Sequence, residues 1–227
     1  MLSTEGNKSM AMDSVLYIDE VFVSIQGEST DTGLPCVFVR LFGCNVGCSF
    51  CDQPQDGKKR TKISIGNLIS KIQKYGVKYV CITGGEPMLQ WNAIYPVILE
   101  LLDYGYKVAI ETSGCIPIDP DPYNRSFKYV MDVKCPSSGV SHKNVYDNLM
   151  NLQPKDEVKF VISDKKDYDF MKKVLSSYPT SAKILISPCF TPDFRPMVGK
   201  ELVDWLIRDR MYNVRVQIQV HKVLGVL

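Results

Sequence analysis

Cys44-Asn45-Val46-Gly47-Cys48-Ser49-Phe50-Cys51 is the stretch around which this chain of 227 residues is organised. Its three thiols, separated by three and then two residues, can converge on one small metal centre if they lie in a tight loop. A zinc site needs a closed tetrahedral shell, so zinc would require a fourth ligand from elsewhere. An iron–sulfur cluster held by three cysteines would instead keep one iron open. Loop cysteines with no metal are the third alternative.

Length and composition limit the class of protein. The chain is long enough for one sizeable domain, and its net charge of +2 gives no reason to expect nucleic-acid binding. No apolar run approaches the length of a membrane span, and the polar start of the chain lacks the apolar core of a signal peptide. Eight cysteines, only three of them clustered, are unlike a secreted disulfide framework. We expect a protein of the reducing cytoplasm.

Predicted strands and helices alternate along the chain. Apolar, β-branched runs predict strands over 16–25, 36–42, 78–82, 107–110, 128–133, 157–162, 183–187 and 214–220. Helical spacing of apolar residues predicts helices near 65–75, 94–104, 145–152, 170–175 and 202–207. Ser64 is the expected N-cap of the first helix and Gly76 its stop, whereas Pro96 fits the second helix only near its first turn. The polar stretch 52–62 is predicted to be a surface loop.

This alternation with short connections predicts an α/β fold with a mostly parallel sheet. A complete eight-unit barrel usually needs about 250 residues. We therefore expect a single-domain partial, open β/α barrel over residues 16–227, preceded by a flexible N-terminal segment of residues 1–15.

Unusual polar motifs follow three of the predicted strands. They are Thr83-Gly84-Gly85-Glu86-Pro87, Glu111-Thr112-Ser113-Gly114 and Lys134-Cys135-Pro136-Ser137-Ser138-Gly139. In isolation each would more often be a plain turn. In a parallel sheet they meet on one rim, where ligands bind. The paired glycines would let the backbone approach a ligand, and Glu86 would offer an acceptor to an ammonium group.

The cysteine motif after an apolar strand resembles the cluster loop of the radical S-adenosylmethionine superfamily, and Gly84-Gly85-Glu86-Pro87 resembles its motif for the methionine amino group. The resemblance implies a 4Fe-4S cluster with S-adenosylmethionine on its open iron, and an external one-electron reductant such as flavodoxin or ferredoxin. The implied cluster ligands are Cys44, Cys48 and Cys51, and the implied cofactor-binding residues are Gly84, Gly85, Glu86, Ser113, Lys134 and Ser137.

From about Tyr17 onward the chain is similar to one branch of that superfamily, the 7-carboxy-7-deazaguanine synthases. The most specific segments, taken in order, are Ser24-Ile25-Gln26-Gly27-Glu28, the cysteine motif with Asp52, Gly84-Gly85-Glu86-Pro87 and Gln219-Val220-His221-Lys222. The resemblance implies a lyase, commonly a homodimer, that converts 6-carboxy-5,6,7,8-tetrahydropterin to 7-carboxy-7-deazaguanine and ammonia on the pathway to queuosine. The implied substrate-binding residues are Gln26, Glu28, Arg40, Thr83, Gly85 and His221, and the candidates for acid/base catalysis are Glu28, Glu111 and His221.

One position departs from the family pattern. The family places Thr or Ser after Cys-Asp, where the hydroxyl binds Mg²⁺, but this chain has Cys51-Asp52-Gln53. A glutamine carbonyl is also a hard oxygen ligand, so Gln53 is a candidate for Mg²⁺. Two other functions stay open at this point. One is a radical activating enzyme that acts on a polypeptide. The other is a non-catalytic zinc-binding module with Cys36 as fourth ligand.

Overall fold

A single curved sheet forms the centre of the computed structural model, which describes residues 15–53, 60–119, 126–191 and 195–226. Within these residues the strand order is β3-β1-β2-β4-β5-β6-β7-β8-β9. The strands are β1 (Val15–Ile25), β2 (Pro35–Leu41), β3 (Thr61–Ser64), β4 (Tyr79–Gly84), β5 (Lys107–Thr112), β6 (Phe127–Val133), β7 (Glu157–Ile162), β8 (Lys183–Pro188) and β9 (Val214–Val216). From β2 to β9 neighbouring strands are parallel, whereas β1 is antiparallel to β2 and β3.

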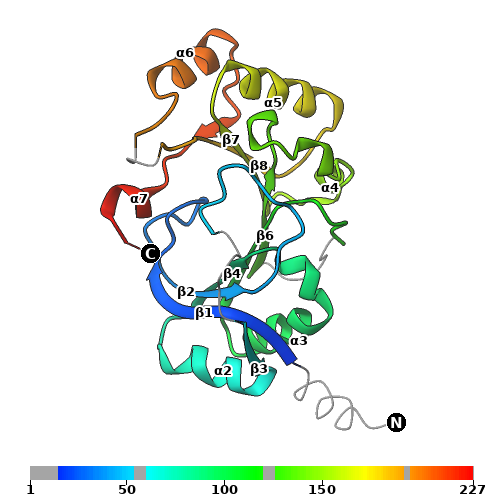
Figure 1. Cartoon of the computed structure of the whole chain (residues 1–227), viewed down its shortest axis with the longest axis vertical. Helices are drawn as coiled ribbons and strands as arrows, with labels where there is room; N and C mark the ends of the chain where they lie inside the picture. Colours follow the sequence, from blue (N-terminus) through cyan, green and yellow to red (C-terminus); the bar gives the residue numbers. More distant parts are fainter. Residues whose placement is uncertain (1–14, 54–59, 120–125, 192–194, 227) are drawn as a thin grey trace.

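The larger helices lie outside the curve of the sheet, and the segment with the three cysteines lies within it (Figure 1). The helices are α2 (Ile65–Lys74), α3 (Trp91–Asp103), α4 (Asn148–Asn151), α5 (Lys165–Ser177), α6 (Lys200–Arg208) and α7 (Val220–Leu224), with 3-10 turns η1 (Pro87–Gln90), η2 (Pro136–Ser138) and η3 (Ser141–Lys143). As predicted, Ser64 caps α2, because its side chain accepts a hydrogen bond from Asn67 N. No helix of the described ranges is long and apolar enough to cross a membrane.

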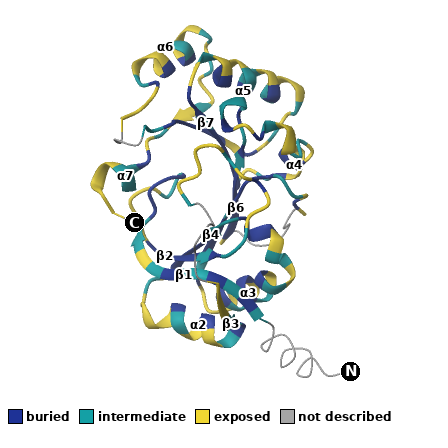
Figure 2. Cartoon of the chain, viewed as in Figure 1, coloured by how far each residue is buried: buried dark blue, intermediate teal, exposed yellow. Residues whose placement is uncertain are grey.

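The main core lies between the sheet and the outer helices, which turn their buried faces toward the strands (Figure 2). In α2, for example, Leu68 and Ile72 are fully buried at helical spacing. A second, smaller cluster contains Phe38, Tyr79 and Cys81. Phe38 also lines a large cavity on the inner side of the sheet. The inside of the barrel is therefore only partly filled by side chains.

The prediction of an open, mostly parallel partial barrel is confirmed. The predicted strand 214–220 is wrong in its second half, because β9 ends at Val216 and α7 begins at Val220. Here the chain leaves the sheet edge, and Val220 N donates a hydrogen bond to Gly27 O at 2.9 Å. The C-terminal segment thus returns to the loop after β1, on the open side of the partial barrel.

Three smaller predictions differ from the structure. Residues 61 and 62 of the predicted loop 52–62 begin the edge strand β3, which pairs with β1, while 54–59 lie outside the described residues. Pro96 lies in the second turn of α3, where its missing N–H cannot bond the carbonyl one turn back. Of the predicted flexible segment 1–15, residues 1–14 lie outside the described residues, and Val15 already belongs to β1.

Candidate active site

A cavity of about 750 Å³ opens where the parallel strands end. Its volume falls within the range of small-molecule sites, roughly 300–1,000 Å³. Fourteen of the sixteen residues predicted for the site line it: Gln26, Glu28, Arg40, Cys44, Cys48, Cys51, Gln53, Thr83, Gly84, Gly85, Glu111, Ser113, Lys134 and His221. The two that do not are Glu86 and Ser137. The expectation that the motifs share one rim is therefore confirmed.

The three cysteines of the motif are free thiols at the mouth of this cavity. Cys44 and Cys51 are exposed and Cys48 is half-buried. Burial raises the pKa of the Cys48 thiol, and the charge of Lys134 opposes that rise. Within the described ranges no three His, Cys, Asp or Glu side chains are close enough to hold one metal ion. A zinc ion would draw its sulfurs to within about 4 Å of each other, whereas a cluster binds each cysteine through a different iron.

This donor set fits a three-cysteine cluster better than a single zinc ion. Cys36, the fourth ligand in the zinc alternative, is fully buried on β2, where it packs beside Cys81 in the smaller core cluster. It does not line the cavity that contains the other three thiols. The zinc-binding module is therefore not supported by the structure.

A lysine fastens the turn between the first two cysteines. Lys143 Nζ donates to the carbonyl oxygens of Asn45 and Val46 at 2.8 and 2.7 Å. Because Val46 is also buried, this turn is held by one ammonium group and one apolar side chain. Nothing in the cysteine motif itself predicts this contact, since Lys143 lies almost a hundred residues further along the chain.

Ser137 also helps to hold the cysteine loop in place, and it does not line the cavity. Its carbonyl accepts from Ser49 Oγ at 3.0 Å, and its N–H donates to Asp167 Oδ1 at 3.0 Å. Ser138 O accepts from Ser49 N, also at 3.0 Å. The structure therefore places Ser137 behind the cysteine loop rather than among the cavity-lining residues.

The paired glycines at the end of β4 let the cysteine loop lie directly against the strand. A Cβ on Gly85 would stand 1.9 Å from Gly43 O, and one on Gly84 would stand 2.4 Å from backbone atoms of Leu41. Gly85 N donates to Leu41 O at 3.0 Å. The paired glycines were expected to let the backbone approach a ligand. In the structure they also let the end of β4 approach the cysteine loop.

Glu86 is turned away from the cavity. It is completely buried, and its carboxylate accepts hydrogen bonds from Met88 N at 3.0 Å, Thr112 Oγ1 at 2.7 Å and Ser113 N at 2.8 Å, besides a contact with Ser113 Oγ. These bonds join η1 to the end of β5. The structure therefore does not bring this carboxylate to the predicted ammonium site, because its acceptor capacity is used within the protein.

Three of the predicted polar residues meet in the wall of the cavity. Glu111 accepts from Gln26 Nε2 at 3.1 Å and from Thr83 Oγ1 at 3.2 Å. The side chains come from β5, from the loop after β1 and from β4. Both oxygens of Glu111 thus have donors.

Arg40 lies on β2 with its guanidinium over the ring of Phe22 at 4.8 Å. Its Nη1 donates to Glu20 Oε1 at 2.6 Å. The Arg40 side chain lines the cavity but is already paired, so an anionic ligand would share it with Glu20.

The C-terminal segment completes the cavity wall. A Cβ on Gly27 would stand 1.9 Å from His221 Nδ1, so only glycine lets the imidazole pack against this turn. Burial lowers the pKa of His221, and the nearby charge of Glu28 opposes that shift. Gln219, which is buried, donates to the Glu28 carboxylate. Glu28, near the N-terminus, and Gln219 and His221, near the C-terminus, thus form one cluster of polar side chains.

Comparison with known proteins identifies the family. The model of the radical SAM superfamily matches residues 39–130. The curated 7-carboxy-7-deazaguanine synthase of Methanospirillum hungatei is 38% identical over 97% of this chain and 90% of its own. The synthase of Koribacter versatilis is 38% identical over 91% of this chain and 96% of its own. The chain belongs to the 7-carboxy-7-deazaguanine synthase family. The crystal structure of QueE from Escherichia coli, at 21% identity, shares the fold with a TM-score of 0.74 over 97% of this chain and 100% of that one.

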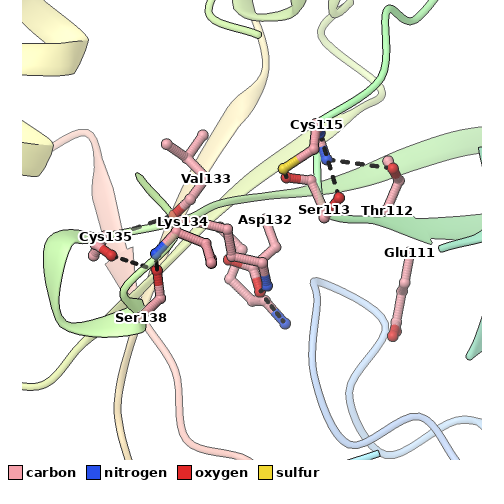
Figure 3. A network of polar contacts seen from close by, with 12 residues as sticks. Glu111, Thr112, Ser113, Cys115, Asp132, Val133, Lys134, Cys135 and Ser138 are labelled. Carbon is pink, nitrogen blue, oxygen red and sulfur yellow. Dashed lines mark hydrogen bonds and ion pairs between the residues drawn. The ribbon is translucent and has the colours of Figure 1, made fainter. Parts of the chain in front are cut away.

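Membership of this radical S-adenosylmethionine family implies a 4Fe-4S cluster and S-adenosylmethionine. The residues present fit both groups. Three free thiols line the cavity, and the ends of β4, β5 and β6 beside them supply Gly84, Ser113 and Lys134. Asp132 and Lys134 pair at 2.8 Å at the end of β6, next to β5 with Glu111 and Ser113 (Figure 3).

Several residues that line the cavity could not be predicted from the motifs of the sequence. Lys159, Asp132 and Phe190 line the cavity, and Lys159 contacts the carboxylate of Glu28. One signal was available, because Lys159 is a charged residue in the middle of the run that predicted β7. A charged residue inside a central strand points either to an ion pair or to a site. Asp132 interrupts β6 in the same way.

Proposed function

We propose that this protein is a radical S-adenosylmethionine lyase that converts 6-carboxy-5,6,7,8-tetrahydropterin to 7-carboxy-7-deazaguanine with loss of ammonia, in the biosynthesis of queuosine and other 7-deazapurines. The observation that carries the proposal is the convergence of Gln26, Glu28, Arg40 and His221 on the cavity that also contains the three cysteines. The printed names of the relatives support the same reaction. When bound, the cluster and S-adenosylmethionine supply the 5′-deoxyadenosyl radical that starts the chemistry.

The side chains that line the cavity suit a carboxylated pterin. Arg40 offers a planar fork for the carboxylate. Gln26 and Glu28 offer directional hydrogen bonds to the pyrimidine edge of the ring. Phe38 and Phe190 provide apolar surface on the same cavity wall. The cavity combines one guanidinium, a few hydrogen-bonding groups and apolar surface. This combination favours a small planar heterocycle over a polypeptide.

Loss of ammonia requires a proton, and His221 is the best placed of the three candidates. Glu28 is in an ion pair with Lys159, and both oxygens of Glu111 already accept hydrogen bonds. The imidazole of His221 has a pKa lowered by burial, so near neutral pH it can accept a proton and return it. We assign His221 to proton transfer and Glu111 to orientation of Gln26 and Thr83.

We further propose a Mg²⁺ site at Gln53, whose side chain lines the cavity. The adjacent Asp52 lies 3.4 Å from the ammonium of Lys222 and supplies a second hard oxygen ligand nearby. Turnover measured before and after chelation tests the proposal. We expect a loss of activity that added Mg²⁺ restores, and equal rates after chelation would contradict it.

We also propose a homodimer that works in the cytoplasm with an external one-electron reductant, such as flavodoxin or ferredoxin. All eight cysteines are free thiols, which suits a reducing compartment.

Exposed apolar side chains on α6 and α7 favour a subunit interface, among them Ile207, Val223 and Leu224. Sedimentation tests the dimer, and a monomer mass at high protein concentration would contradict it.

Calorimetry with 6-carboxypterin tests the substrate class. The enzyme is reconstituted with iron and sulfide without oxygen, and S-adenosylmethionine is present throughout. We expect binding that is weakened at least about tenfold by Arg40→Met and is unchanged by Lys172→Met, a lysine paired with Asp209 outside the cavity. No heat with any pterin would contradict the proposal and would favour the activating enzyme.

A further inference from the structure

Lys159 is a buried lysine in the cavity whose role the proposed reaction does not define. It lies on β7, lines the cavity, and its side chain is 10% exposed. Its ammonium contacts the carboxylate of Glu28 and lies 3.8 Å from Asp132 Oδ2. Because Glu28 belongs to the loop after β1, this ion pair joins two distant parts of the partial barrel.

The carboxylate of Glu28 is enclosed by its partners. Lys159 contacts one oxygen and Gln219 Nε2 donates to the other, while the side chain is 11% exposed. Further charged or titratable groups around this pair are His221 on α7, Glu111 on β5, Asp132 on β6 and Lys134 just after β6. Lys159 is the cation in direct contact with Glu28, so it supplies the main charge that compensates the buried carboxylate.

We propose that Lys159 is a positioning residue that keeps Glu28 ionised, so that Glu28 serves only as a hydrogen-bond acceptor for the N–H groups of the substrate ring. This inference rests on the proposed function and narrows it. A 2-amino-4-oxopyrimidine edge, as in a pterin, presents an amino group and a ring N–H side by side. An ionised carboxylate accepts from both and has no proton to give. Glu28 is thereby excluded as the acid of the reaction.

The charges around Glu28 agree with this geometry. Burial by itself raises the pKa of Glu28, but the charge and hydrogen bond of Lys159 outweigh burial and hold the pKa at about 2. A carboxyl buried without a compensating cation has its pKa raised by desolvation, by up to about 3–5 units. Removal of the Lys159 charge should therefore allow Glu28 to bind a proton near neutral pH.

Infrared difference spectroscopy of the reconstituted enzyme tests the inference without any substrate. Lys159→Met is expected to show the carbonyl band of a protonated carboxyl at pH 6 that fades at alkaline pH. The band should be absent from the wild type, from Lys159→Arg and from the double variant Lys159→Met/Glu28→Gln. Lys172→Met, whose partner Asp209 is outside the cavity, is the matched control. Identical spectra for Lys159→Met and the wild type would overturn the inference.

The pH dependence of 6-carboxypterin binding gives a second readout. The wild type and Lys172→Met show how the titration of the ligand itself changes its affinity. Compared with both, Lys159→Met should bind 6-carboxypterin at least tenfold more weakly toward acid pH and should recover its affinity toward alkaline pH. Lys159→Arg should follow the wild type in pH profile. If Lys159→Met fails to fold, the double variant Lys159→Met/Glu28→Gln tests the pair. The pH profile of its 6-carboxypterin affinity should match that of Glu28→Gln. A loss of affinity at acid pH in the double variant but not in Glu28→Gln would overturn the inference. A wild type that binds no pterin would instead overturn the proposed function.

Discussion

At the residue scale, the glycines and carboxylates of the motifs have more specific tasks than their patterns predict. From its motif, Glu86 is predicted to bind the cofactor, and Gly27 belongs to a segment predicted to bind substrate. In the structure Glu86 is a buried acceptor between η1 and β5, and Gly27 makes room for His221. Neither task can be read from spacing, because each depends on a residue brought near only by folding.

Gly27→Ala should lower turnover without affecting the cluster. The new Cβ would lie 1.9 Å from His221 Nδ1, so the imidazole must move. Because a misplacement of about 1 Å can cost about 100-fold in turnover, we expect a loss of that order, with the cluster absorbance unchanged. Gly199→Ala is the control, since its Cβ would meet only Pro196 at 3.8 Å. Full activity of Gly27→Ala would show that the position of His221 does not matter.

Glu86→Gln should destabilise the fold even when no cofactor is bound. Met88 N and Ser113 N donate to different oxygens of Glu86, so the NH₂ group of a glutamine would face one buried backbone N–H from which it cannot accept. We expect the free energy of unfolding of the apoprotein to fall by about 2–4 kcal/mol in urea denaturation. Glu201→Gln, on the exposed face of α6, should change it little. Equal stability of wild type and Glu86→Gln would return Glu86 to a purely cofactor-binding role.

At the element scale, most strands could be predicted because apolar runs bounded by turn residues report directly on burial. The exceptions are segments whose structure is set by distant partners. β3 is a short, polar edge strand that exists through its pairing with β1. Residues 217–219 leave the sheet instead of continuing the predicted strand, and α7 begins where Val220 N bonds back to Gly27 O. The support of the cysteine loop by Lys143 was invisible for the same reason.

Lys143→Met should loosen the cysteine loop in the apoprotein. Loss of the two bonds to Asn45 O and Val46 O removes about 1–2 kcal/mol of local stability, which raises amide exchange in residues 44–51 about tenfold. Hydrogen exchange with mass spectrometry measures this, and iron content after reconstitution should fall in parallel. The control is Lys200→Met, an exposed lysine paired with Asp204 on α6. Unchanged exchange in the loop would show that Lys143 is not needed to hold it.

At the scale of the whole molecule, the loop between β1 and β2 reaches from the cavity to the beginnings of β5 and β6. Its first residues line the cavity. Its Asp31 pairs with Lys107 at 2.6 Å and with Lys128 at 2.7 Å, where β5 and β6 begin. The partial barrel was predictable from the order of elements and the chain length. Its closure by this loop and by α7 was not, because loops carry no periodic pattern.

Asp31→Asn should make stability less dependent on acid pH. Burial raises the pKa of Asp31, but Lys107 and Lys128 outweigh burial and lower it. A carboxyl with a lowered pKa stabilises the fold above its unfolded pKa of about 3.9, and that contribution is lost as the pH falls through the folded value. The variant should therefore melt below the wild type at pH 7, and the gap should close below about pH 4. Asp204→Asn is the control, and a gap that persists in acid would contradict the assignment.

We propose that one cavity holds both the radical-generating group and a carboxylated pterin. The most direct test is anaerobic turnover of the reconstituted, reduced enzyme with S-adenosylmethionine and 6-carboxy-5,6,7,8-tetrahydropterin, followed by mass spectrometry of 5′-deoxyadenosine and 7-carboxy-7-deazaguanine. We predict that the deazaguanine forms only when both compounds are present. Formation of 5′-deoxyadenosine without any deazaguanine would contradict the claim, because the cavity would then serve a different substrate.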